Sequence, residues 1–342
     1  MSKVIKQRLS LGMFWPTFDP FLFCAFHNDS YPAGNEKLGP QASLAGRSIG
    51  QDFAGIGGWR MYHGDVVPGF PSHPHRGFET VTIVNKGYVD HADSMGAAGR
   101  YGVGDTQWMT AGSGVQHSEM FPLLRQNEPN PLELFQIWLN LPARNKMVEP
   151  HFAMLWNEQT PNVAFTDGEG NHISVKVVAG SLSDQQGNQV APLAPPPNSW
   201  ASQSDSEVAI WLIDLPANAT WTIPEAVVGL NRTLYFFEGD AITIAGEQAN
   251  VSEAYVVDSS LPLELVGGDK PARLLMLQGR PIGEPVAQHG PFVMNTRQEL
   301  QQAFFDFQRT QFGGWPWPDN DQTHGVEIRR FAKHADGTVE TP

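Results

Sequence analysis

The sequence predicts an all-β fold made of two antiparallel β-barrels in tandem, with few helices and one helix near the C-terminus. The 34 glycines and 27 prolines are spread along all 342 residues, which is typical of many short strands joined by tight turns. Residues 79–91 and 233–244 resemble each other as β-branched hairpins and indicate a weak internal repeat. The length is sufficient for two domains of ordinary size.

The first barrel is predicted at residues 57–145, after an irregular lead-in over residues 1–56 that packs on the barrels. Residues 79–84 are rich in β-branched side chains and end in a turn at 85–87, with a partner strand from residue 88. Residues 132–141 are apolar at both parities, which predicts a strand that is covered on both faces and lies between two domains.

The second barrel is predicted at residues 146–290 and is followed, at 291–342, by a helix and an extended tail. Its expected strands lie at residues 173–178, 208–213, 233–237, 241–244 and 274–277. Thr296 and Glu299 have the spacing of a capping box, and apolar residues recur at helical spacing from Leu300 to Phe307 before the Gly313-Gly314 stop.

Charge and composition exclude several classes of protein. The net charge of −14 argues against direct nucleic-acid binding, because an acidic surface repels phosphate backbones. No run approaches the roughly 18 apolar residues of a membrane span, so no membrane attachment is expected. Cys24 is the only cysteine, so no intrachain disulfide can form, and a cytoplasmic location is expected.

Candidate metal ligands cluster between His73 and Glu119. His73 and His75 are two residues apart, as are His117 and Glu119, and residues at that spacing point to the same face of a strand. Two neighbouring strands could therefore bring three imidazoles and a carboxylate to one ion. Glu79 competes with Glu119, because it shares parity with His73 and His75; alternatively it orients a ligating imidazole.

The ligand set constrains the metal only in part. Three histidines and a carboxylate suit Fe(II), Mn, Ni, Cu or Zn, and the donors alone do not choose among them. Four ligands on an octahedral ion leave two positions open, which suits an enzyme or a sensor. No histidine lies between His172 and His289, so the second barrel is expected to be metal-free.

Several segments resemble the pirin family of the cupin superfamily. Residues 69–82 and 104–119 carry the most specific likeness, and the shorter matches are residues 18–21, 134–142 and 284–295. The resemblance implies a bicupin, in which two cupin barrels face each other and only the N-terminal one holds metal. It places the ligands on His73, His75, His117 and Glu119 and implies iron as the usual metal.

The resemblance implies two kinds of activity. Some pirins resemble quercetinases and cleave flavonols with dioxygen, whereas others act in the nucleus as metal-dependent transcriptional coregulators. This sequence departs from the family in a longer segment between Phe21 and Gly69 and in the tail after Phe312. Either addition could cover or reshape the pocket.

The residues and the resemblance are compatible with three functions. The first is an Fe(II)-dependent dioxygenase of the quercetin 2,3-dioxygenase type, in which Glu119 or Glu79 accepts the hydroxyl proton of a small aromatic substrate. The second is a non-enzymatic, redox-sensing regulatory protein whose iron state tunes a surface for a basic protein partner. In the third, the metal only stabilises the barrel.

Overall fold

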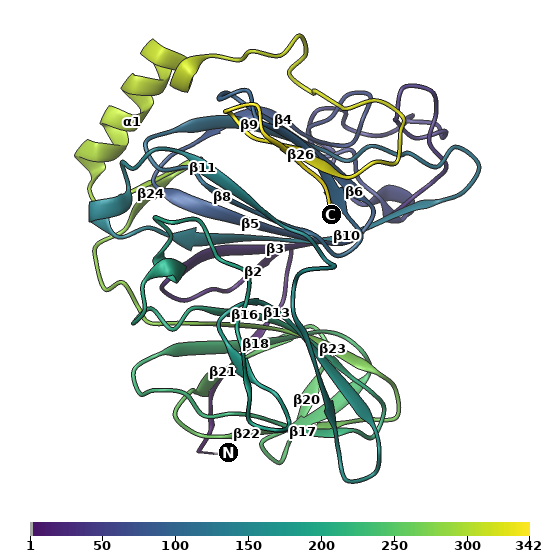
Figure 1. Cartoon of the computed structure of the whole chain (residues 1–342). Helices are drawn as coiled ribbons and strands as arrows, with labels where there is room; N and C mark the ends of the chain where they lie inside the picture. Colours follow the sequence, from purple (N-terminus) through teal and green to yellow (C-terminus); the bar gives the residue numbers. More distant parts are fainter. Residues whose placement is uncertain (1–2) are drawn as a thin grey trace. The chain divides into compact units, whose positions relative to one another are not determined.

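The computed structural model describes residues 3–342 and is mostly β, with two cupin domains (Figure 1). The first barrel contains Phe26–Asn157 and Glu284–Pro342; the second contains the segment that ends at Ala25 and Glu158–Gly283. The lead-in predicted at residues 1–56 is divided between these two units.

Two antiparallel sheets form the first barrel. One has the order β11-β8-β5-β10-β3-β2, in which β2 (Phe14–Trp15) and the first residues of β3, up to Ala25, belong to the segment assigned to the second barrel. The other has the order β27-β26-β7-β6-β9-β4. Their strands are β3 (Phe21–Tyr31), β4 (Gly69–His75), β5 (Phe78–Lys86), β6 (Tyr88–Asp93), β7 (Ala98–Gly102), β8 (Thr106–Thr110), β9 (Val115–Met120), β10 (Asn130–Asn140), β11 (His151–Leu155), β26 (Phe331–Lys333) and β27 (Val339–Glu340).

The second barrel has a seven-stranded and a four-stranded sheet around an apolar core. The larger sheet contains β1 (Ile5–Ser10), β21 (Glu253–Asp258), β18 (Asn231–Glu238), β23 (Ala272–Gly279), β16 (Ala209–Leu215), β13 (His172–Ala179) and β12 (Asn162–Thr166). The smaller contains β17 (Thr220–Ile223), β22 (Leu263–Gly267), β19 (Ala241–Ile244) and β20 (Glu247–Asn250), and a separate hairpin joins β14 (Leu182–Ser183) to β15 (Gln189–Val190).

The predicted strands and helix are confirmed where the pattern was strongest. The β-branched run at 79–84 lies inside β5, and the apolar run at 132–141 largely coincides with β10. Helix α1 (Arg297–Thr310) begins with the predicted capping box between Thr296 and Glu299 and packs against the hairpin of β24 (Ala287–His289) and β25 (Phe292–Met294). It is the only α-helix in residues 3–342; the other helical segments are short 3-10 turns at 56–58, 143–145, 200–202 and 311–313.

The lead-in and the tail are more ordered than the sequence suggests. The lead-in contains β1, β2 and β3, and the tail adds β26 to the edge of β7. Strand β1 is mostly exposed, so no alternation of apolar residues marks it, and its partner β21 is far away in the sequence. No helix in residues 3–342 is long and apolar enough to cross a membrane.

Candidate metal centre

The antiparallel pairing of β4 with β9 brings the predicted histidines together. His73 lies directly opposite His117 in this pair, and His75 follows two residues later on the same face. The ring centroid of His117 lies 4.5 Å from that of His73 and 4.9 Å from that of His75. One ligand atom from each imidazole can lie within 4.8 Å of the other two, so the three histidines could hold one metal ion.

Hydrogen bonds fix the orientation of two of these imidazoles. His73 Nδ1 lies 2.9 Å from the Pro71 carbonyl, and His75 Nδ1 lies 3.4 Å from the Pro291 carbonyl. A carbonyl can only accept, so Nδ1 donates in each ring and Nε2 keeps its lone pair for a metal.

His117 is buried, and neither of its ring nitrogens has a hydrogen-bond partner among residues 3–342. A buried, unpaired polar group is costly and calls for an explanation. Burial lowers the pKa of all three imidazoles, so they are neutral and suited to ligation at neutral pH. A metal ion would satisfy the free nitrogen that faces the other two rings.

Glu119 lies beside the three histidines, and side chains of the opposite sheet donate hydrogen bonds to it. Its Oε2 is 3.9 Å from His117 Nε2, so it borders the cluster and lies outside the tight histidine set. Thr82 on β5 donates to Glu119 Oε1 at 3.0 Å, and Gln136 on β10 donates to Oε2 at 3.0 Å. These two donors fix the carboxylate inside the barrel.

The structure does not bring Glu79 to the histidines. Thr82 faces Glu119 and Phe78 packs against His75, so the even-numbered residues of β5 face the site and Glu79 points to the opposite sheet face. Glu79 instead accepts a 2.6 Å hydrogen bond from Thr110. Parity is not kept from His75 to Glu79 because Gly77, at φ 86°, interrupts the extended backbone between β4 and β5.

Aromatic side chains border the cluster on two sides. The rings of Phe78 and Trp138 lie 5.1 and 5.5 Å from that of His75. His91 lies 5.5 Å from His117, and its Nε2 is 3.2 Å from Asp93. On the other side, Phe70 lies 6.4 Å from His73 and begins an aromatic group that extends into the lead-in.

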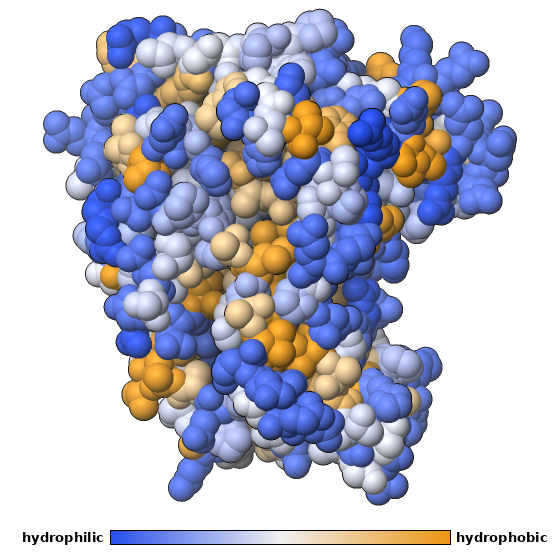
Figure 2. Space-filling model, viewed as in Figure 1, coloured by the Kyte–Doolittle hydropathy of each residue, from blue (hydrophilic) through white to orange (hydrophobic). Residues whose placement is uncertain are grey.

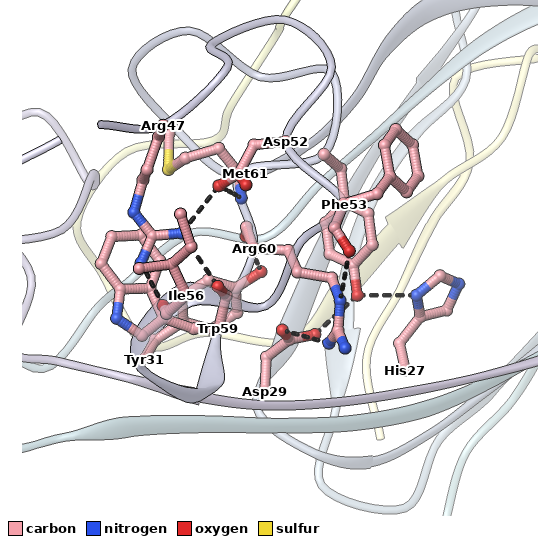
Figure 3. Close-up of polar contacts among 11 residues, drawn as sticks. His27, Asp29, Tyr31, Arg47, Asp52, Phe53, Ile56, Trp59, Arg60 and Met61 are labelled. Carbon is pink, nitrogen blue, oxygen red and sulfur yellow. Dashed lines mark hydrogen bonds and ion pairs between the residues drawn. The ribbon is translucent and has the colours of Figure 1, made fainter. Parts of the chain in front are cut away.

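This aromatic group contacts a buried polar network formed by side chains between residues 27 and 62 (Figure 3). Tyr62 donates to Asp29 at 2.6 Å, and Arg60 pairs with the other oxygen of Asp29 at 3.0 Å. The Tyr62 hydroxyl has one proton, so the 2.8 Å contact to His27 Nδ1 makes His27 the donor. Burial first, and Arg60 next, lower the pKa of His27 to about 4.

A second pair of contacts holds the loop that precedes Arg60 (Figure 3). Arg47 pairs with Asp52 at 2.7 Å and lies over the ring of Trp59 at 3.3 Å. Both charged side chains are buried. The long lead-in is therefore fixed beside the site by ion pairs and ring contacts.

Helix α1 and the C-terminal tail form one wall of a cavity next to His73, opposite the strands of the barrel. The cavity measures about 490 Å³ and is lined by Ser72, His73, Pro74 and Gln116 on the barrel and by Phe307, Gln311, Gly314, Trp315 and Asn320. Gln116 donates to the Gln311 carbonyl at 2.6 Å, and the Ser72 amide donates to the Asn320 carbonyl at 2.8 Å. In Figure 1 the segment after α1 passes over the ends of β4 and β9.

Sequence reasoning missed the residues that hold and surround the predicted ligands. Thr82 and Gln136 lie on strands that were predicted, and their inward parity could have identified them once Glu119 was placed. His27, Asp29 and Tyr62 have no such signal, because the fold joins residues about 35 positions apart in a segment without clear periodicity.

Comparison with known proteins identifies the family. The pirin model matches residues 16–139, and the model of the pirin C-terminal cupin domain matches residues 210–313. A Pseudomonas aeruginosa protein provisionally named as a quercetin 2,3-dioxygenase is 40% identical over 250 residues, which cover 71% of this chain and 79% of that protein. Pirin-1 of Arabidopsis thaliana is 35% identical over 250 residues, which cover 72% of this chain and 78% of Pirin-1.

A solved structure extends the likeness over most of the chain. The crystal structure of quercetin 2,3-dioxygenase from Acinetobacter baumannii superposes with a TM-score of 0.69 at 25% identity, covering 92% of this chain and 99% of that one. The three-histidine cluster, the paired cupin domains and these relatives agree, and the chain belongs to the pirin family.

Proposed function

We propose that this pirin is an Fe(II)-dependent dioxygenase of the quercetin 2,3-dioxygenase type, acting on a flavonol or a similar aromatic. The observation that carries the proposal is the buried His117, whose unpartnered nitrogens lie within a group of three converging imidazoles. His73, His75 and His117 are the proposed ligands, with Glu119 as the fourth. Mn, Ni, Cu or Zn remain chemically compatible with this donor set.

The donors fit a catalytic metal better than a structural one. The set contains no thiolate, and structural zinc sites are more often closed and rich in cysteine. When bound, Fe(II) would supply the redox chemistry with dioxygen that the protein side chains lack.

Glu119 is the proposed acceptor for the hydroxyl proton of the substrate. A general base must lie within hydrogen-bond reach of that proton, and Glu119 borders the histidine cluster. The hydrogen bonds from Thr82 and Gln136 keep its carboxylate in one orientation. Glu79, the other candidate, lies on the opposite face of its strand.

The aromatic side chains around the histidines support the proposal of an aromatic substrate. Phe78 and Trp138 lie against His75, and Phe70 lies beside His73, so apolar rings flank the histidines on two sides. Small-molecule pockets are commonly apolar with a few converging polar groups. An apolar wall would also exclude water from the reacting centre.

A regulatory function remains the alternative proposal. The net charge of −14 would favour a basic protein partner. Hydrophilic side chains cover much of the face drawn in Figure 2, with hydrophobic ones gathered in patches between them. In that case the iron state would tune a binding surface without turnover. In either case we place the protein in the cytoplasm, since its single cysteine is buried and unpaired.

Quercetin turnover tests the enzymatic proposal. Oxygen uptake is measured with an electrode on the iron-loaded protein, on His75→Ala and on His172→Ala. His172 is an exposed histidine of the second barrel and serves as the matched control. Uptake that disappears only in His75→Ala supports the dioxygenase. Iron-loaded wild type without uptake would contradict it and favour the regulatory alternative.

A further inference from the structure

The second barrel lacks a histidine cluster, but it holds a buried arginine on its inward face. Arg232 lies on β18, directly opposite Gln278 on β23, and is 1% exposed. Leu234 and Phe236, at the same parity of β18, belong to the apolar core of this barrel. The guanidinium therefore lies at one end of the barrel interior, next to the apolar core.

The hydrogen bonds of Arg232 leave most of its donors unused. Its Nε donates to Gln278 Oε1 at 2.6 Å, and one terminal nitrogen donates to the Pro224 carbonyl at 2.9 Å. A guanidinium has five N–H donors, so three remain. No carboxylate in residues 3–342 forms an ion pair with Arg232, in contrast to Arg273 on the neighbouring strand, which pairs with Asp214 and Glu238.

Arg232 lines a cavity of about 790 Å³ within the second barrel. Hydroxyl groups are frequent in the lining, which includes Ser181, Ser183 and Ser206, and Trp211 adds an aromatic side chain. Small-molecule sites typically measure about 300–1,000 Å³ and combine apolar walls with a few polar groups. The cavity has the size and the mixed lining of such a site.

A buried charge without a counter-ion is costly, and removing one partner of a buried pair is strongly destabilising for this reason. Burial lowers the pKa of Arg232 to about 10, so the guanidinium still carries its charge at neutral pH. An anion in the cavity would compensate this charge and occupy the unused N–H groups.

We propose that the cavity of the second barrel is a binding site for a small organic carboxylate, held by the guanidinium of Arg232. A carboxylate matches the planar fork of an arginine, with which it forms two parallel hydrogen bonds. The serine hydroxyls and Trp211 would contact the body of the ligand. This site is independent of the metal centre proposed for the first barrel.

The rim of the cavity favours a singly charged ligand. Glu207 and Glu225 line the same cavity and are exposed, and they would repel a second negative charge. A phosphate monoester carries close to two charges at neutral pH, whereas a carboxylate carries one. The charge distribution therefore selects a carboxylate over a phosphate.

Fluorine NMR with 4-fluorobenzoate tests the proposal on the full-length protein. Wild type is expected to broaden the fluorine signal in a saturable manner, and Arg232→Met is expected to weaken binding by at least about tenfold, because a charge-assisted hydrogen bond is lost. Arg232→Lys keeps the charge without the fork and should bind with intermediate affinity. Arg273→Met is the matched control and should bind like wild type.

Melting temperatures separate loss of the site from loss of the fold. Saturating 4-fluorobenzoate should raise the melting temperature of wild type relative to equal ionic strength of chloride, and it should leave that of Arg232→Met unchanged. Without ligand, Arg232→Met loses the hydrogen bonds to Gln278 and Pro224, so it should melt somewhat lower than wild type but still in one cooperative transition.

Absence of saturable binding to wild type, equal binding to Arg232→Met, or preferential binding of inorganic phosphate would each overturn the proposal. His75→Ala should bind 4-fluorobenzoate like wild type, so failure of the dioxygenase proposal leaves this result unaffected.

Discussion

Glu119 and Glu79 show how one backbone detail assigns the role of a carboxylate. Both are buried, and both lie near the two histidine segments in sequence. Glu119 keeps the parity of His117 within a continuous strand, whereas the turn at Gly77 reverses the parity of Glu79 relative to His75. The face of the strand, rather than the residue type, decides which carboxylate can reach a substrate.

Exchanging each carboxylate for an amide tests this distinction. Glu119→Gln should lower quercetin turnover by about 100-fold or more, in the range that loss of a general base produces. Glu79→Gln should keep turnover within about twofold of wild type. Steady-state oxygen uptake, normalised to bound iron, is the measurement. The reverse order of the two variants would contradict the assignment.

His27 makes the first barrel sensitive to acid. Its pKa is about 4 in the folded protein, against about 6.5 for an ordinary histidine, chiefly because it is buried. Below pH 6.5 the unfolded chain binds a proton that the folded protein does not bind until about pH 4. The stability that the neutral imidazole contributes is therefore complete above pH 6.5 and is lost as the pH falls toward 4.

The expected loss between pH 7.5 and pH 5 is about 2 kcal/mol, because about 1.5 pH units of this range lie below 6.5 and each unit is worth about 1.4 kcal/mol. Denaturant unfolding of the wild type and of His27→Gln at pH 7.5 and pH 5 measures it. The free energy of unfolding should fall less between the two pH values in His27→Gln than in wild type. In His172→Gln, a variant in the second barrel, it should fall as much as in wild type. An equal decrease in wild type and His27→Gln would contradict the effect.

At the scale of elements, the sequence predicts the strand pair of the site and misses its surroundings. The two i, i+2 pairs identify β4 and β9 because strand parity alone places His73, His75 and His117 on one face. The wall next to His73 depends on contacts between β9 and residues about 195 positions later, such as Gln116 with Gln311. No local periodicity encodes such long-range contacts.

Trp315 provides a test of the tail as a wall of the cavity. Trp315→Ala should speed removal of bound iron by a chelator several-fold, because it opens the cavity beside His73 while leaving the ligands in place. Iron content at equilibrium should be unchanged. Phe305→Ala is the matched control, since Phe305 is an exposed aromatic on α1 and does not line the cavity. Equal removal rates in all three proteins would show that the tail does not restrict access.

At the scale of the whole molecule, composition and the internal repeat predict two β-barrels, but not how the chain is divided between them. The glycine and proline content and the two similar hairpins favour tandem barrels. The structure contains both barrels. The first strand, β1, pairs with β21 in the second barrel, although it precedes the first barrel in sequence. Its exposed side chains lack the apolar alternation that would predict this pairing.

The two barrels also differ in the chemistry of their interiors. The first places three neutral imidazoles and a carboxylate inside, and the second places an arginine and a glutamine there. The absence of histidines from 173–288 predicts that the second barrel lacks such a cluster. The sequence did not reveal Arg232, because a single arginine in a strand is usually exposed.

The most direct test of the account is the position of iron in the first barrel. Crystals grown anaerobically with Fe(II) are measured at the iron absorption edge, and an anomalous difference map is calculated. We predict one peak per chain, within bonding distance of a nitrogen of each of His73, His75 and His117. A map without a peak there, or with its strongest peak elsewhere, would contradict the proposed metal centre and the dioxygenase function that depends on it.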